Sequence, residues 1–264
     1  MINLHFIFKV LSHYASATRI DVLHSPFVYT LYNQCIRKQQ TQPDWIMIEQ
    51  LRINALRNKK QIIQNDYGAS GFKQPLKKHK VSYLAAKHAK PSRIAQILNL
   101  LVKHYHLNHA IELGTSLGFT SAYIAKALPE NGLLHTVEGA PEIAALAHEH
   151  FKSLGIEKKI VQHVQKFDDI LPHILTNLPK LDLAFIDGNH TYQATINYFN
   201  SCLPYVHNST VLVMDDIYWS KEMTKAWEEI KLHPQVTVTV DLFFIGLVFF
   251  RTEQAKEHFK LRIW

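Results

Sequence analysis

From residue 109 onward, short apolar segments of strand length alternate with segments of helical periodicity. Such an alternation is typical of strands joined by helical crossovers, which make a parallel sheet covered by helices on both faces. The last two strand segments are almost contiguous, so we expect them to form an antiparallel hairpin. The seven predicted strands lie in the segments 109–114, 133–139, 160–165, 181–188, 209–216, 236–242 and 246–251. The sequence therefore predicts an α/β, Rossmann-like, doubly wound seven-stranded sheet, mostly parallel with a C-terminal antiparallel hairpin.

The first 80 residues have a different pattern, with helical segments and no strand pattern. Helices are expected over residues 6–17, 25–40 and 44–63, with Ser25 as an N-cap before Pro26. Two glycines then interrupt the pattern, and residues 73–80 are expected to form a loop. We therefore predict a helical N-terminal extension over residues 1–80, serving as a cap, substrate or dimer region, and a catalytic domain over residues 81–264.

Charge and cysteine content indicate which binding partners and which cellular compartment to expect. The net charge is +7, and residues 1–80 hold 12 Lys and Arg against four Asp and Glu. A solvated helical surface explains this excess better than an anion or RNA site, although the latter stays open. The cysteines Cys35 and Cys202 form no metal-binding motif, which indicates a reducing compartment and a cytoplasmic protein. The longest apolar run, residues 242–250, is about half the length of a membrane span, so no membrane partner is expected.

Acidic residues stand at the ends of the predicted strands, where ligands bind in sheets of this kind. They are Glu112, Glu138, Asp187, Asp215 and Asp216. A strand interior disfavours Asp and Glu, and a buried charge needs a partner, so these acids indicate a site.

The first strand end continues into a turn with two glycines, Gly114 and Gly118. Ser116 stands where a dinucleotide-binding GxGxxG motif would have its second glycine. Glu112 adds negative charge, so the turn suits a cationic ligand better than a pyrophosphate. Glu138 could accept both hydroxyls of a ribose, and the two carboxylates together suggest S-adenosylmethionine. The alternative for Glu138 is a surface acid after an edge strand.

Four segments resemble class I S-adenosylmethionine-dependent methyltransferases, in particular the group with the catechol and caffeoyl-CoA O-methyltransferases. The segments are "AIELGTSLGFTSAYIA", "LLHTVEGAPEIAALA", "LDLAFIDGNHTY" and "VLVMDDIYW", within a resemblance over residues 85–251. It implies a cofactor site in which Glu112 and the turn hold the methionine part. The full set of implied cofactor residues is Glu112, Gly114, Thr115, Ser116, Gly118, Glu138, Gly139, Phe167, Asp168 and Asp187. For Asp168, a helix N-terminal charge is an equally good explanation.

The same resemblance implies a divalent cation, Mg²⁺ or another, bound by Asp187, Asp215 and Asp216. The third ligand in that group is usually Asn, and its lysine base is replaced here by His190. Histidine can accept a proton near neutral pH, so His190 and Asp187 are the predicted catalytic residues, and the alternative for His190 is that it is itself a metal ligand. The alternative is that Asp187 and Asp215 hydrogen-bond the backbone amides of their loops. Tyr192, Tyr218 and Trp219 are expected either to stack on an aromatic acceptor or to cover the loops.

The predicted function is therefore methylation of a small-molecule hydroxyl. An NAD(P)-dependent oxidoreductase of Rossmann type is the alternative enzyme, but the GxGxxG turn is missing. A non-enzymatic module that binds an anion or RNA through the basic N-terminal region is the third hypothesis. The acceptor pocket would involve segments outside the resemblance, so the acceptor is not identified. Apolar helices outside the core could support a homodimer.

Overall fold

The computed structural model describes residues 4–37, 41–64 and 77–263. The chain divides into two compact units. The first unit comprises Met1–Lys38 and Lys180–Trp264, and the second comprises Gln39–Pro179. The polypeptide therefore enters the first unit, passes through the second and returns. The predicted boundary at residue 80 stays a prediction.

The second unit contains three parallel strands in the order β3-β4-β5. β3 (His109–Leu113) pairs with β4 (Leu133–Val137), and β4 pairs with β5 (Ile160–His163). The helices of this unit are α3 (Pro43–Arg57), α4 (Val81–Lys87), α5 (Ser92–His104), α6 (Phe119–Ala127), α7 (Pro141–Ser153) and α8 (Phe167–Asn177), with a 3₁₀ turn η3 (Glu157–Lys159). The crossover helices between parallel strands bring the strand ends, with their acidic residues, to one edge of the sheet.

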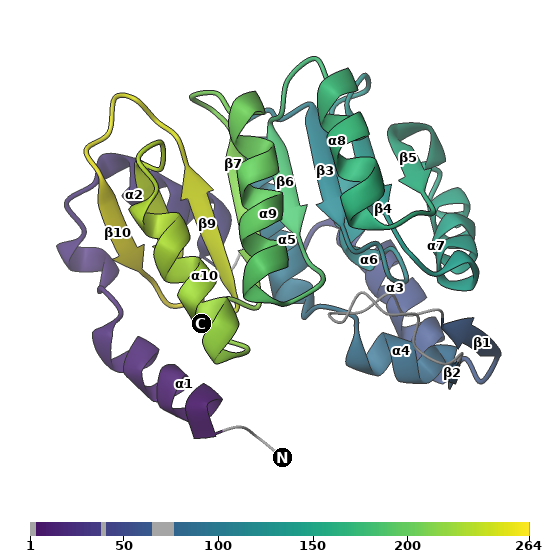
Figure 1. The fold of residues 1–264 in the computed structure, drawn as a ribbon. Coiled ribbons are helices and arrows are strands. Elements are labelled where there is room, and N and C mark those ends of the chain that lie inside the picture. Colours follow the sequence, from purple (N-terminus) through teal and green to yellow (C-terminus); the bar gives the residue numbers. More distant parts are fainter. Residues whose placement is uncertain (1–3, 38–40, 65–76, 264) are drawn as a thin grey trace. The chain divides into compact units, whose positions relative to one another are not determined.

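The first unit contains five strands in the order β10-β8-β9-β7-β6. β6 (Leu183–Ile186) is parallel to β7 (Val211–Asp215), whereas β9 (Ile245–Phe249) runs antiparallel to both β7 and β8 (Val238–Asp241). Its helices are α1 (Leu4–Ser16), α2 (Pro26–Leu31), α9 (Tyr192–Cys202) and α10 (Lys221–Leu232), with short turns η1 (Ile20–Val22), η2 (Tyr32–Ile36) and η4 (Leu203–Tyr205). α9 and α10 pack side by side in Figure 1.

All seven predicted strands are present, and the α/β class is confirmed. The number of strands was wrong, because β10 (Glu257–Lys260) adds an eighth strand parallel to β8. Its sequence, EHFK, carries no apolar alternation, and its first two residues are exposed. An edge strand of this composition has no periodic signal that could have revealed it.

The N-terminal region contains strands that the sequence pattern did not reveal. The predicted helix over 44–63 ends at Arg57, since Asn58 adopts an extended conformation. β1 (Gln61–Gln64) then pairs antiparallel with β2 (Lys77–Lys80), which lies within the segment expected to be a loop. The two-glycine segment 65–72 lies outside the described residues.

The predicted N-cap of α2 is confirmed. The Ser25 side chain accepts a hydrogen bond from the Val28 amide, and Pro26 opens the helix. The predicted helix over 25–40 continues beyond α2 as a π-helical turn, η2, and the backbone becomes extended at Arg37. Residues 38–40 lie outside the described residues.

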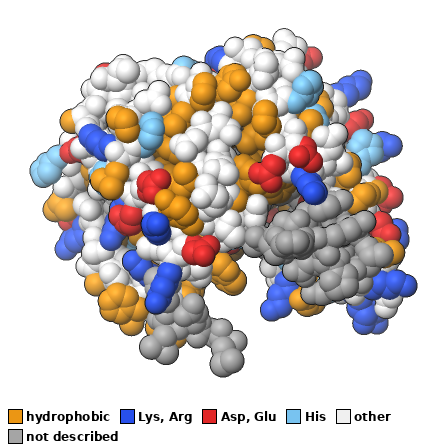
Figure 2. All heavy atoms as spheres, in the orientation of Figure 1, with side chains coloured by type: hydrophobic (Ala, Val, Ile, Leu, Met, Phe, Trp, Pro, Cys, Tyr) orange, Lys and Arg blue, Asp and Glu red, His pale blue; other side chains and the backbone are white. Residues whose placement is uncertain are grey.

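The β1–β2 ribbon brings two basic runs together. Val81 donates its amide to the Lys60 carbonyl, and Gln61 is the register partner of Lys80. Lys59, Lys60, Lys78 and Lys80 are all exposed. Figure 2 shows Lys and Arg side chains at the edge where Figure 1 places β1 and β2. Binding of an anion or a nucleic acid by this region stays a prediction.

No helix within residues 4–37, 41–64 and 77–263 is long and apolar enough to span a membrane. A cytoplasmic location stays a prediction.

Candidate functional site

The glycine turn follows β3 in the second unit and is held against the end of β4. The amides of Gly114 and Thr115 both donate to the Val137 carbonyl, at 3.0 and 3.1 Å. Gly114 and Gly118 have positive φ values of 110° and 79°, and so does Ser116 at 48°. Gly118 is also the N-cap residue of α6, and no side chain caps that helix. The backbone amides in the first helical turn of α6 therefore have no side-chain cap at the glycine turn.

Gly118 is required by packing as well as by conformation. A Cβ atom at this position would lie 2.5 Å from the Phe151 ring and 3.1 Å from the Ala147 Cβ. α7 therefore lies so close to the turn that only glycine fits at this position. The sequence pattern alone attributed this glycine to a ligand near the backbone, and Phe151 supplies a second reason.

Glu112 lies beneath the turn rather than at its surface. Its carboxylate is fully buried and accepts hydrogen bonds from the hydroxyls of Ser121 on α6 and Thr136 on β4. Because the Thr136 proton goes to Glu112, the Thr115 hydroxyl, 2.6 Å away, donates to Thr136. These hydroxyls compensate the buried carboxylate and fix the turn to β4. Direct contact of Glu112 with a cofactor stays a prediction.

Glu138 follows β4 and spans from the glycine turn to the start of α7. Its Oε2 atom accepts from the Ser116 amide at 2.8 Å, and its Oε1 atom accepts from the Ala140 amide at 2.9 Å. The residue is half-buried. A carboxylate has about four lone-pair sites, so both oxygens can accept further donors while they keep these two amides.

The remaining predicted cofactor residues differ in accessibility. Gly114, Ser116, Gly139 and Phe167 are half-buried, whereas Asp168 is exposed in the first turn of α8. Thr115 and Gly118 are buried. The predicted cofactor residues of this unit that retain accessible surface are therefore Gly114, Ser116, Glu138, Gly139, Phe167 and Asp168.

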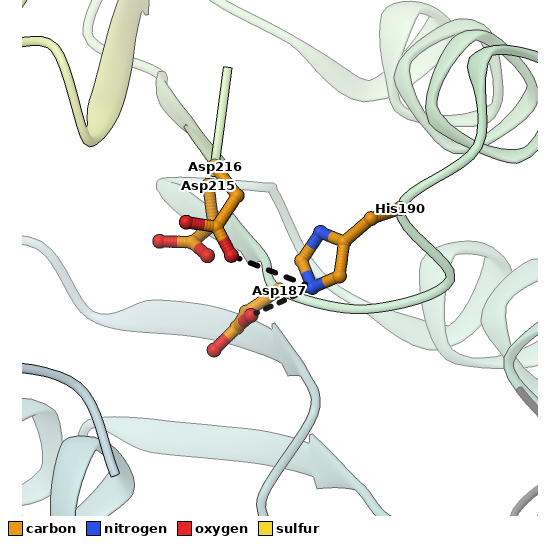
Figure 3. Close-up of side chains that lie close together, drawn as sticks. All are labelled: Asp187, His190, Asp215 and Asp216. Atoms are coloured by element: carbon orange, nitrogen blue, oxygen red, sulfur yellow. Dashed lines mark ion pairs between the residues drawn. The ribbon is translucent and has the colours of Figure 1, made fainter. Parts of the chain in front are cut away.

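The predicted metal and catalytic residues converge within the first unit (Figure 3). Asp187, His190, Asp215 and Asp216 each offer a ligand atom, and these atoms lie within 4.8 Å of one another. The His190 Nε2 atom is 3.6 Å from the Asp187 Oδ1 atom and 3.7 Å from the Asp216 Oδ2 atom. Three carboxylates at this spacing repel one another, and an oxygen-preferring divalent cation would neutralise them.

The local backbone explains how two consecutive aspartates join one cluster. Asp215 ends β7 and is 2% exposed, while Asp216 adopts a left-handed conformation with φ of 52°. Its amide donates to the Phe244 carbonyl at 2.7 Å. Consecutive strand residues point to opposite faces, so this turn at Asp216 is what brings the second carboxylate beside the first.

Tyr192, Tyr218 and Trp219 have different surroundings. Tyr218 is buried and donates its hydroxyl to Asp241, while Tyr192 donates to Glu229 and its ring lies beneath the Lys225 ammonium. Burial, followed by the nearby Asp241 carboxylate, raises the pKa of Tyr218 well above its usual value. Trp219 is 61% exposed. Of the three, Trp219 has the free surface that stacking on an acceptor requires.

Comparison with known proteins finds a family model and several relatives that resemble this chain. Residues 111–217 match the family model of a methyltransferase domain, a span that begins just before Glu112 and ends just after Asp216. The chain is 30% identical over 123 residues to the catechol O-methyltransferase of Niastella koreensis, covering 46% of this chain and 55% of that protein. It is 35% identical over 94 residues to the transmembrane O-methyltransferase of Homo sapiens, covering 34% and 32%. The match thus spans about half of the length of the first relative and about a third of the length of the second.

The chain also resembles solved structures. The O-methyltransferase TomG from Streptomyces achromogenes in complex with SAM has a TM-score of 0.54 and 22% identity, covering 62% of this chain and 82% of that chain. The O-methyltransferase from Bacillus cereus in complex with SAH has a TM-score of 0.57 and 18% identity, covering 88% and 100%. At this identity the likeness establishes the fold, and it favours neither the oxidoreductase nor the non-enzymatic alternative.

Proposed function

We propose that this protein is an S-adenosylmethionine-dependent O-methyltransferase that acts on a small-molecule hydroxyl. The observation that carries the proposal is the position of Glu138. Its half-buried carboxylate follows β4 and is oriented by two backbone amides, one on each oxygen. A vicinal diol such as that of a ribose is the ligand group that uses two acceptor oxygens side by side.

The turn supports a cationic amino-acid part of the cofactor. Ser116, with its left-handed φ of 48°, lies beside the Glu138 carboxylate, and the buried Glu112 places a negative charge behind the turn. A sulfonium or ammonium group would be attracted to both carboxylates, whereas a pyrophosphate would be repelled. Phe167, half-buried at the start of α8, is the proposed contact for the adenine ring.

The acidic cluster fits a divalent cation by its donor set. Asp187, Asp215 and Asp216 would hold the ion, and their carboxylate oxygens are the ligands that Mg²⁺ prefers. A bound cation lowers the pKa of an acceptor hydroxyl and orients it. We propose that the His190 imidazole, whose Nε2 atom faces these carboxylates, accepts the hydroxyl proton.

Methyl transfer needs little covalent chemistry from the protein, so positioning is the main contribution. The sulfonium methyl group must lie in line with the acceptor oxygen, and water must not compete with the acceptor. Trp219 is the proposed acceptor contact, because its ring is exposed. Its amide also donates to the Asp216 carbonyl at 2.9 Å, which ties it to the turn that carries Asp216. An aromatic acceptor would stack on this ring.

The test is calorimetric titration of S-adenosylmethionine into the full-length protein and its Glu138→Ala variant, with and without Mg²⁺. We expect binding by the wild type and at least a tenfold weaker affinity in the variant, since two hydrogen bonds to a carboxylate are lost. Glu149→Ala is the matched control, because Glu149 is an exposed acid on the adjacent helix α7. Wild-type protein that does not bind the cofactor in either condition would refute the proposed function.

A further inference from the structure

Asp241, at the end of β8, is the centre of a buried network outside the predicted site. The residue is 3% exposed. It accepts hydrogen bonds from the Tyr218 hydroxyl and from the Phe243 amide, the latter at 2.9 Å. Its Oδ1 atom is 3.3 Å from the Nδ1 atom of His13, which belongs to α1. A segment far away in the sequence therefore reaches the loop that follows β7.

Both ring nitrogens of His13 face oxygen atoms. Its Nε2 atom lies 3.1 Å from the Leu261 carbonyl, and a carbonyl only accepts, so the proton on that side belongs to His13. Burial would raise the pKa of Asp241, but the hydrogen bonds from His13 and Tyr218 outweigh it, so this pKa lies below its usual value. Asp241 is therefore a carboxylate that accepts hydrogen bonds from Tyr218 and Phe243 and has the His13 ring beside it.

The network holds two turns in unusual conformations. Asp216 and Phe243 both have left-handed φ values, 52° and 72°, which residues with a side chain adopt only when the surroundings enforce them. The Asp216 amide donates to the Phe244 carbonyl, so the two turns are joined directly. Tyr218 joins them a second time through Asp241.

α1 covers this junction with aromatic and cationic side chains. Phe6 packs edge-on against Phe243 at 5.3 Å between ring centroids, and the Lys9 ammonium lies 5.2 Å from the centre of the Tyr218 ring. Tyr218 and Phe243 are themselves in ring contact at 5.4 Å. α1 thus contributes three contacts, through Phe6, Lys9 and His13, to the turns that carry Asp216.

We propose that His13, Asp241 and Tyr218 are positioning residues that present the Asp216 carboxylate to a divalent cation. The inference rests on the proposed function, and in particular on a cation held by Asp187, Asp215 and Asp216. It gives α1 a role in the catalytic site that lies outside the matched family segment, residues 111–217. None of the three positioning residues is among the clustered ligand groups.

The experiment is titration of Mn²⁺ into the wild type and the Tyr218→Phe and His13→Gln variants. Tyr218→Phe keeps the ring and removes only the hydroxyl that Asp241 accepts. We expect Mn²⁺ to bind at least fivefold more weakly to both variants, while the affinity for S-adenosylmethionine changes by less than twofold. Thermal unfolding of each variant shows that it is folded.

Tyr123→Phe is the matched control. Tyr123 is also buried, and its hydroxyl donates to the Glu49 carboxylate at 2.9 Å, but it belongs to the second unit. This variant loses a comparable hydrogen bond and should bind Mn²⁺ as the wild type does. Wild-type Mn²⁺ affinity in folded Tyr218→Phe and His13→Gln would overturn the inference and leave the proposed function intact. A wild type that binds S-adenosylmethionine but no Mn²⁺ would overturn both the inference and the metal site.

Discussion

The glycine turn of the second unit and the acidic cluster of the first unit use carboxylates in opposite ways. In the turn, Glu112 accepts from two hydroxyls and Glu138 from two backbone amides, so each carboxylate has protein donors. In the cluster, three carboxylates and one imidazole converge within 4.8 Å. The turn is therefore preorganised by its own hydrogen bonds, whereas the cluster brings like charges together, which a bound cation would neutralise.

The comparison predicts that a ligand variant in the cluster has a large and local effect. Asp215→Asn removes a buried carboxylate at the end of β7. We expect Mg²⁺ or Mn²⁺ affinity to fall by about 100-fold or more, and methyl transfer with it, because a neutral amide replaces a charged ligand. S-adenosylmethionine affinity, measured without metal, should change by less than threefold. Calorimetry with each ligand checks both parts.

The matched control for that variant is Asp182→Asn. Asp182 is a buried acid of the same unit, with the His207 Nε2 atom at 3.0 Å, but it lies outside the cluster. Its substitution should lower stability without changing cation affinity. If Asp215→Asn weakened the cofactor as much as the cation, the two sites would not act separately and the comparison would fail.

A second prediction concerns the rigidity of the turn. Gly118→Ala places a Cβ atom 2.5 Å from the Phe151 ring and also forces a φ of 79° on a non-glycine residue. We expect the free energy of unfolding to fall by about 2–4 kcal/mol, from overpacking and backbone strain together. Urea denaturation measures it.

Gly155→Ala separates the two contributions. Gly155 has a similar positive φ of 64°, and nothing lies within 4 Å of the position that a Cβ atom would take there. This substitution should cost only about 1–2 kcal/mol, the backbone part. Equal losses in the two variants would show that Phe151 moves aside freely, and the turn would then be less rigid than we infer.

The two sites also differ in what their sequence could reveal. Parallel strands place their last residues at one edge, so periodicity alone located Glu138, Asp187 and Asp215. The left-handed turn that rotates Asp216 into the cluster leaves no periodic signal. The pattern placed Asp216 at a strand end, and the resemblance alone implied its role as a metal ligand. The fold class followed from alternation of strands and helices for the same reason.

The missed features depend on contacts between distant segments. In the sequence, His13 is an ordinary residue of a predicted helix and Asp241 lies near the end of a predicted strand. Only the fold brings the two side chains together. β1 and β2 pair across residues 65–76, and neither has the apolar alternation of a half-buried strand. Tertiary pairing decides such elements, and local propensity does not.

The smallest predicted effect is a difference in acid sensitivity within the second unit. Burial, together with the neighbouring His163 and His109, lowers the pKa of His135 to about 4. Its Nδ1 atom is 3.1 Å from the His163 Nε2 atom, and the two rings stack. The unfolded chain binds this proton near the ordinary histidine pKa of about 6.5, so between roughly pH 6.5 and 4 the unfolded state holds more protons than the folded state. The contribution of His135 to stability is therefore complete above that window and is lost as the pH falls through it.

Asp241 in the first unit also loses its contribution on acidification, but in a lower pH window. Its lowered pKa means that its contribution is present above the ordinary aspartate pKa and is lost only as the pH falls below it. Comparing urea midpoints at pH 7 and pH 4.5 for the wild type and His135→Gln isolates the histidine. We expect the wild type to lose about 1 kcal/mol more than the variant, a value reduced for the partial exposure of His135. Because His233 and His258 in the first unit also have lowered pKa values through burial, the variant retains some acid sensitivity. An identical loss of unfolding free energy in the wild type and His135→Gln would contradict the prediction. It would show that the His135–His163 contact does not set the acid response of the second unit.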